Sequence, residues 1–83
     1  MLENTIICTI LVRNQILSLC EAYKELNIDF NPVYEAIQAL DNFLKYGNMT
    51  KNNIQETLKD TLEIRKILVE LAYTEINNAG MAE

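Results

Sequence analysis

Apolar positions recur with a helical period along almost the whole chain. Between residues 32 and 46, Val33, Ile37, Leu40 and Leu44 follow one another at steps of three or four and oppose charged and amide side chains. This spacing puts the apolar side chains on one face of an α-helix. No stretch shows the two-residue alternation of a half-buried strand. The pattern therefore predicts an all-α fold.

Glycine, proline and capping residues divide the chain into helices. We expect the first helix over about residues 5–26, with Asn4 as its N-cap. The second covers about residues 32–46, because Asn31 and Pro32 provide a cap followed by proline at the first helical position. Gly47 fits the left-handed residue that closes many helices.

The third helix begins after Thr50, a good N-cap, and covers about residues 51–78, which leaves 79–83 as a short tail beyond it. Residues 1–83 then form one domain, a three-helix up-down bundle of long, short and long helices. The alternative is a four-helix monomer in which the third helix breaks near Thr61 and folds back.

The unequal helix lengths favour a homodimer. At 1.5 Å per residue the helices measure roughly 33, 22 and 42 Å, so short connections leave the first turns of helix one and the last turns of helix three uncovered. An 83-residue domain also buries little surface by itself. Twofold pairing would cover both overhangs, which predicts a homodimeric helical bundle.

The same two regions carry apolar residues at solvent-facing positions. The polar face that holds Asn14 and Ser18 continues back onto Leu11 and Ile7, and the third helix is apolar nearly all round after Thr61. Large exposed apolar surfaces usually mark interfaces. We expect the dimer or partner interface to contain Ile7, Ile10, Leu11, Ile64, Ile67, Leu68 and Leu71.

Two arginines stand among these apolar residues and are candidate anchors for an ion pair or an anionic ligand. Arg65 lies off the charged stripe of the third helix, and Arg13 adjoins Asn14 and Gln15. Arginine is enriched at interface hot spots. The alternative for Arg65 is a side chain that extends along the edge of the core, and for Arg13 a polar layer that fixes the register of a dimer.

Charge and cysteine content exclude several classes of function. The net charge is −5 and the basic residues are scattered, so a nucleic-acid footprint is not expected. Cys8 and Cys20 would lie roughly 18 Å apart on one helix, too far for a disulfide. Without His or a Cys-x-x-Cys pair we expect no metal and no cofactor. Both cysteines are expected to be small buried hydrophobes.

The chain also shows no recognisable catalytic motif, so we expect no enzyme. Histidine, the commonest general base, is absent, and no Ser or Cys stands in a nucleophile motif. The apolar run over residues 6–12 lacks the preceding basic residues of a signal peptide and is shorter than a membrane span. We therefore expect a cytoplasmic protein that does not bind a membrane.

These inferences lead to a small acidic helical protein that acts by binding another macromolecule as a homodimer, in the manner of an adaptor, chaperone, immunity protein or inhibitor. A second hypothesis is a small-ligand module with a pocket at the dimer seam, anchored by Arg13 or Arg65. A third is a small RNA-binding helical dimer, which the acidic charge disfavours.

Overall fold

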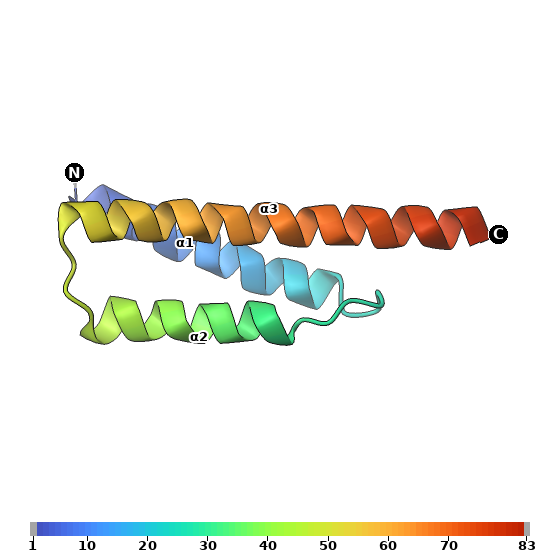
Figure 1. Ribbon diagram of the computed structural model, residues 1–83, viewed down its shortest axis with the longest axis horizontal. Helices are drawn as coiled ribbons and strands as arrows, with labels where there is room; N and C mark the ends of the chain where they lie inside the picture. The colour runs from blue at the N-terminus through green and yellow to red at the C-terminus, as the bar shows by residue number, and fades with distance from the viewer. Residues whose placement is uncertain (1, 83) are drawn as a thin grey trace.

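The computed structural model describes residues 2–82 of the chain, with side chains from Leu2 to Asn78. It contains α1 (Leu2–Ala22), α2 (Asn31–Tyr46) and α3 (Lys51–Ala82), and this part of the chain has no strand. The helices run up, down and up, so that α1 and α3 point the same way and α2 returns between them in sequence (Figure 1). The all-α three-helix bundle is confirmed.

The core is centred on the seam between α1 and α3, which pack closer together than either packs against α2. Small residues permit this approach, because Thr9 and Cys20 of α1 and Thr61 and Ala72 of α3 are all almost completely buried. The larger side chains of the seam fill the space between these small residues. They are Val12, Ile16, Ile54 and Leu68.

The two buried threonines satisfy their hydroxyl groups within their own helices. Thr9 Oγ1 donates to the carbonyl of Thr5 at 2.7 Å, and Thr61 Oγ1 donates to the carbonyl of Thr57 at 2.7 Å. A buried hydroxyl without a partner would cost roughly 1–3 kcal/mol. Threonine therefore serves here as a small seam residue without leaving an unpaired polar group.

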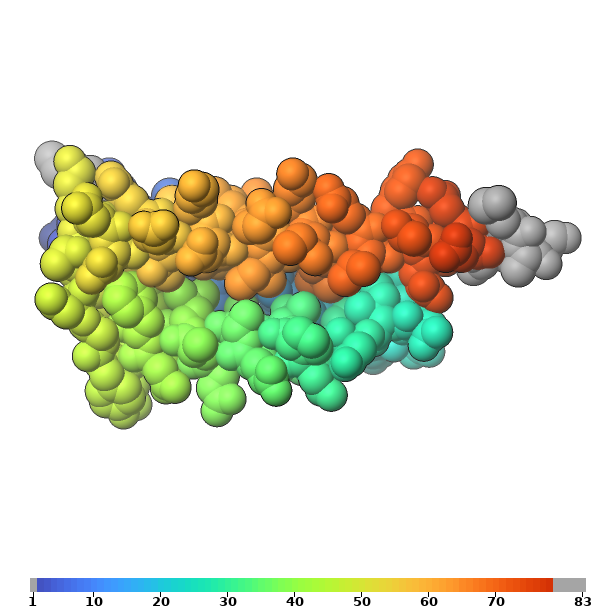
Figure 2. All heavy atoms as spheres, viewed as in Figure 1, coloured from blue at the N-terminus to red at the C-terminus, as the bar shows by residue number. Residues whose placement is uncertain are grey.

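The second helix covers one side of the α1–α3 pair. Its apolar face places Ile37 and Leu40 in the core, with Val33 and Leu44 packed against it. Small Ala36 faces the α3 residues Ile64 and Thr61 across a narrow gap. Figure 2 shows α2 and α3 side by side along this surface.

The ends of α1 differ from the sequence prediction. The helix begins at Leu2, so Asn4 lies in its first turn and is not the N-cap. It ends at Ala22, four residues early, because the amides of Lys24 and Leu26 bond to carbonyls three residues back. This change to tighter turns starts the reversal into α2.

The caps of α2 are also different. Phe30 occupies the N-cap position and Asn31 is already helical, with its amide bonded to Asp29 Oδ1 at 3.1 Å. Gly47 has φ −76° and ψ 163°, so the predicted left-handed cap is wrong. Glycine is needed there for a different reason: a Cβ would stand 2.6 Å from the carbonyl oxygen of Phe43 and would also collide with its ring.

The third helix is continuous, which excludes the break near Thr61 and the four-helix monomer. Thr50 caps it as predicted, since Thr50 Oγ1 accepts from the amide of Asn53 at 3.1 Å. The helix continues through Gly80 to Ala82, beyond the predicted end. It thus passes the α1–α2 connection and gives the molecule its 50 Å length (Figure 1).

Only α3 overhangs its neighbours. The sequence predicted a second overhang at the start of α1, but α1 begins beside the first turns of α3 (Figure 1). Thr9 of α1 and Ile54 of α3 are both fully buried near that end. The prediction that the start of α1 overhangs its neighbours is wrong, because α1 and α3 run parallel from a common end; Leu2, Glu3 and Asn4 are nevertheless exposed.

Candidate interaction surface

The side of the α1–α3 pair that α2 leaves uncovered carries a groove of about 610 Å³. Its wall on α1 includes Leu11, Leu19 and Ala22, and its wall on α3 is formed by Arg65. The Nη1 atom of Arg65 donates to Gln15 Oε1, which ties the two helices together across the groove. An apolar floor with one guanidinium at its edge suits a packed side chain or an anion-bearing apolar ligand.

A second groove of about 540 Å³ adjoins the first and shares Arg65 with it. Leu58 and Leu62 provide its apolar part, and Lys59 and Lys66 stand along its rim. The two grooves make one continuous surface, which we call the open face. It comprises Leu11, Gln15, Leu19, Leu58, Leu62 and Arg65, and continues along α3 through Val69 and Ile76.

The continuation along α3 follows from a seven-residue repeat. Leu62, Val69 and Ile76 are spaced by seven, which places them on one helical face, and they are 37%, 43% and 54% exposed. None of these three residues belongs to the interface predicted from the sequence. The seven-residue spacing could have revealed them. It was hard to recognise because the core repeat of Ile54, Thr61 and Leu68 lies on the adjacent face of the same helix, and the two repeats together look like one broad apolar face.

The predicted interface residues of α1 lie on the surface. Ile7 and Leu11 are more than half exposed, as projection of the polar face suggested, and Ile10 is 40% exposed. Leu11 joins the open face. Ile10 lies one turn before Arg13, which points to α2, so it belongs to the α2 side of α1.

The predicted interface residues of α3 are not on the open face. Ile64 and Ile67 line a small gap with Pro32 and Val33 of α2, and Leu71 is exposed one turn beyond Ile67. The structure therefore does not bring them together with Leu11. The participation of the exposed residues of α1 and α3 in an interface stays a prediction.

Leu68 requires a correction, because the side chain is completely buried inside the chain. It packs in the core cluster with Ile16 and Cys20 of α1 and Ile37 of α2. Leu68 therefore stabilises the bundle itself and is not available to a partner. The apolar pattern of α3 showed that most of its circumference was apolar but not which part α1 would cover.

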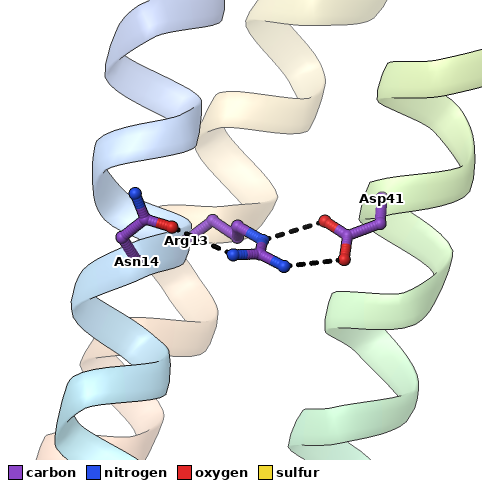
Figure 3. Close-up of polar contacts among 3 residues, drawn as sticks. All are labelled: Arg13, Asn14 and Asp41. Carbon is purple, nitrogen blue, oxygen red and sulfur yellow. Dashed lines mark hydrogen bonds and ion pairs between the residues drawn. The ribbon is translucent and has the colours of Figure 1, made fainter.

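Arg13, the other predicted anchor, is engaged within the chain. Its Nε donates to Asp41 Oδ1 at 2.9 Å and its Nη2 to Oδ2 at 2.8 Å, which joins α1 to α2 (Figure 3). Its Nη1 also donates to Asn14 Oδ1 at 3.0 Å. The hydrogen bond from Arg13 lowers the pKa of Asp41, and the same bond raises the pKa of the guanidinium. Arg65, by contrast, contacts only a neutral amide in the hydrogen bond described.

The Arg13–Asp41 pair makes the stability of the bundle depend on acid pH. Since the pKa of Asp41 is lower in the folded than in the unfolded chain, its contribution is complete above the ordinary carboxyl range and disappears as pH falls through it. We expect Asp41→Asn to lower the free energy of unfolding by about 0.5–1 kcal/mol at pH 7, because the pair is bidentate but partly solvated.

Urea titration of both proteins between pH 7 and pH 2 measures this dependence. The difference between them should shrink as the solution becomes acidic. Glu56→Gln, on the charged stripe of α3, is the control and should change little at any pH. A difference between wild type and Asp41→Asn that grows toward acid pH would contradict the assignment.

The two cysteines have different surroundings. Cys20 is buried in the core, and desolvation raises its pKa. Cys8 is exposed on α1, so the prediction that both are buried is wrong for Cys8. Within residues 2–82 no three His, Cys, Asp or Glu side chains approach closely enough to hold a metal ion.

α1 has the length and composition of a membrane-crossing helix, with a mean hydropathy of 1.3 over 18 residues. The apolar run over residues 6–12 is only a part of this helix. Core helices and N-terminal signal sequences share these properties. Here α1 supplies Thr9, Val12, Ile16 and Cys20 to the core, so insertion into a bilayer would separate it from α3.

Comparison of the chain with protein-family models, curated proteins and solved structures gives no match.

Proposed function

We propose that the chain is a small acidic interaction protein without catalytic activity, which forms a homodimer and binds another macromolecule. The observation that carries this proposal is the open face, where exposed apolar side chains of α1 and α3 adjoin in one surface. Exposed apolar surface is costly to maintain in water unless a partner covers it.

The chemistry of the open face supports a binding role. Its polar members are the Arg65 guanidinium, the lysines of its rim and several further side chains, namely Asn14, Gln15, Ser18, Gln55 and Glu63. Neither groove holds a carboxylate paired with a nucleophile, and the chain has no His. What these side chains supply is packing area with a cationic edge, which suits recognition of an apolar surface that carries acidic groups.

Sedimentation equilibrium over a wide range of concentration tests the dimer. We expect wild-type protein to show twice the mass of the 9.6 kDa chain and Leu11→Glu to dissociate. Glu56→Gln, an exposed change that preserves shape and lies in neither groove, is the control and should remain dimeric. A wild type that stays monomeric at high concentration, or a Leu11→Glu protein that stays dimeric, would contradict the proposal in this form.

The groove beside Arg65 supports a second candidate, a site for a small apolar anion. Leu11, Leu19 and Ala22 would contact the apolar part of such a ligand and Arg65 its charge. A thermal-shift screen of carboxylates and nucleotides separates the two candidates, since a specific ligand raises the melting temperature by mass action. Arg65→Ala should abolish that rise, whereas a pure protein-binding surface gives no rise with any compound.

A further inference from the structure

We infer that the partner on the open face is a second copy of this chain in antiparallel orientation, with the twofold axis near Val69. In this arrangement the overhanging end of each α3 lies over the grooves of the other copy, so that Ile76 of one chain meets Leu62 of the other. The inference rests on the proposed function for the existence of a dimer and adds its surface and direction.

The chain exposes more surface than a compact monomer of its mass, and the excess is close to the area that one partner buries in an interface of standard size. A compact monomer of 9.6 kDa exposes about 5,100 Å² by the usual scaling of area with mass, whereas this chain exposes 5980 Å². The excess is about 900 Å², close to the roughly 800 Å² that each partner buries in a typical stable interface. The radius of gyration, 14.6 Å against about 12 Å expected, shows the same extension.

The overhang of α3 determines the direction. Figure 1 shows that α3 extends past the α1–α2 connection, and in the last described turns of α3 Tyr73 and Ile76 are 68% and 54% exposed. A short helical segment without tertiary contacts is only marginally stable in water. A parallel dimer would place both overhangs at one end, in contact only with each other. An antiparallel dimer places each overhang over the Leu62 and Leu11 region of its partner.

Charge along α3 favours the same direction. Residues 51–66 carry four basic and three acidic side chains, while residues 67–78 carry two glutamates and no basic residue. Antiparallel pairing brings the acidic half of one α3 against the half whose groove carries three basic side chains, Lys59, Arg65 and Lys66, and one acidic side chain, Glu63. Parallel pairing would align like charges, which is destabilising. Helix dipoles also oppose one another in the antiparallel pair.

The spacing of the apolar residues sets the register. Leu62 and Ile76 lie seven residues on either side of Val69, so an axis at Val69 matches Leu62 to Ile76 twice and Val69 to itself. Arg65, four residues before Val69, then lies level with Tyr73 of the partner, four residues after it. A guanidinium beside an aromatic ring is a favourable contact.

Cysteine cross-linking distinguishes the directions. In a Cys8→Ser background, with Cys20 kept because it is buried, single variants Leu62→Cys, Val69→Cys and Ile76→Cys are oxidised alone and in pairwise mixtures. We expect Val69→Cys to link to itself, and Leu62→Cys to link efficiently to Ile76→Cys but at least tenfold less to itself. Ile67→Cys, equally exposed on the α2 side, is the matched control and should not link.

The cross-linking and sedimentation results together test the direction of the dimer, its interface and its existence. Self-links of Leu62→Cys and of Ile76→Cys without mixed links would mean a parallel dimer, which overturns the direction but not the proposed function. A wild type that sediments as a dimer while no open-face pair links would mean another interface and would also overturn the inference. A wild type that sediments as a monomer would overturn the inference and the proposed dimer together.

Discussion

Leu68→Glu should prevent the chain from folding at neutral pH. The leucine side chain is fully buried among residues of all three helices, so the change removes about 1.5–3 kcal/mol of apolar burial and adds several kcal/mol for a buried carboxylate. Domains of 83 residues have roughly 4–12 kcal/mol of stability in total. Far-UV circular dichroism should show loss of most helical signal.

Ile67→Glu is the matched control for this result, because Ile67 is the adjacent residue and is 46% exposed. It should retain the helical signal and unfold cooperatively in urea. The milder Leu68→Ala should fold but lose about 2–5 kcal/mol. A folded Leu68→Glu protein with near wild-type stability would show that α3 is rotated differently about its axis.

Leu62→Glu combined with Val69→Glu should produce a folded monomer. Both side chains are already partly exposed in the single chain, so the fold is retained, but each dimer loses four apolar side chains from its interface. At about 1–1.5 kcal/mol for each side chain, the dissociation constant should rise by roughly a thousandfold or more. Sedimentation equilibrium measures the mass, and circular dichroism confirms the fold.

The comparison variant is Ile67→Glu combined with Leu71→Glu, which places the same two charges on the α2 side of α3. We expect this protein to remain dimeric. The reverse result, with a dimer for the first pair and a monomer for the second, would move the interface to the residues that the sequence pattern first suggested. Monomers from both pairs would mean an interface that spans both sides of α3.

The periodic pattern of apolar residues was sufficient to predict the helices and their number. Ile37 and Leu40 were placed correctly on the inner face of α2, and Thr50 was correctly identified as a cap. These features depend on contacts within one helix or one turn, where spacing along the chain fixes spacing in three dimensions. The exposure of Ile7 and Leu11 was predicted by the same argument.

The candidate site was less predictable. The pattern showed that the second half of α3 has more apolar surface than one neighbour can cover, but Leu68 and Val69 look equivalent in it. Only the position of α1 buries Leu68 and leaves Val69 exposed. The ion pair of Arg13 was equally unpredictable, since its partner Asp41 is 28 residues away on another helix.

The sequence by itself thus determined the helices, their polar and apolar faces and the surplus of apolar surface. The tertiary structure decided which apolar residues become core, which side α2 covers, and that Gly47 is required by the ring of Phe43. The physical reason is that helical periodicity specifies a face on each helix, whereas the rotation of that face toward its neighbours depends on packing among all three. Small residues at the α1–α3 seam set that rotation and leave Leu62, Val69 and Ile76 on the open face.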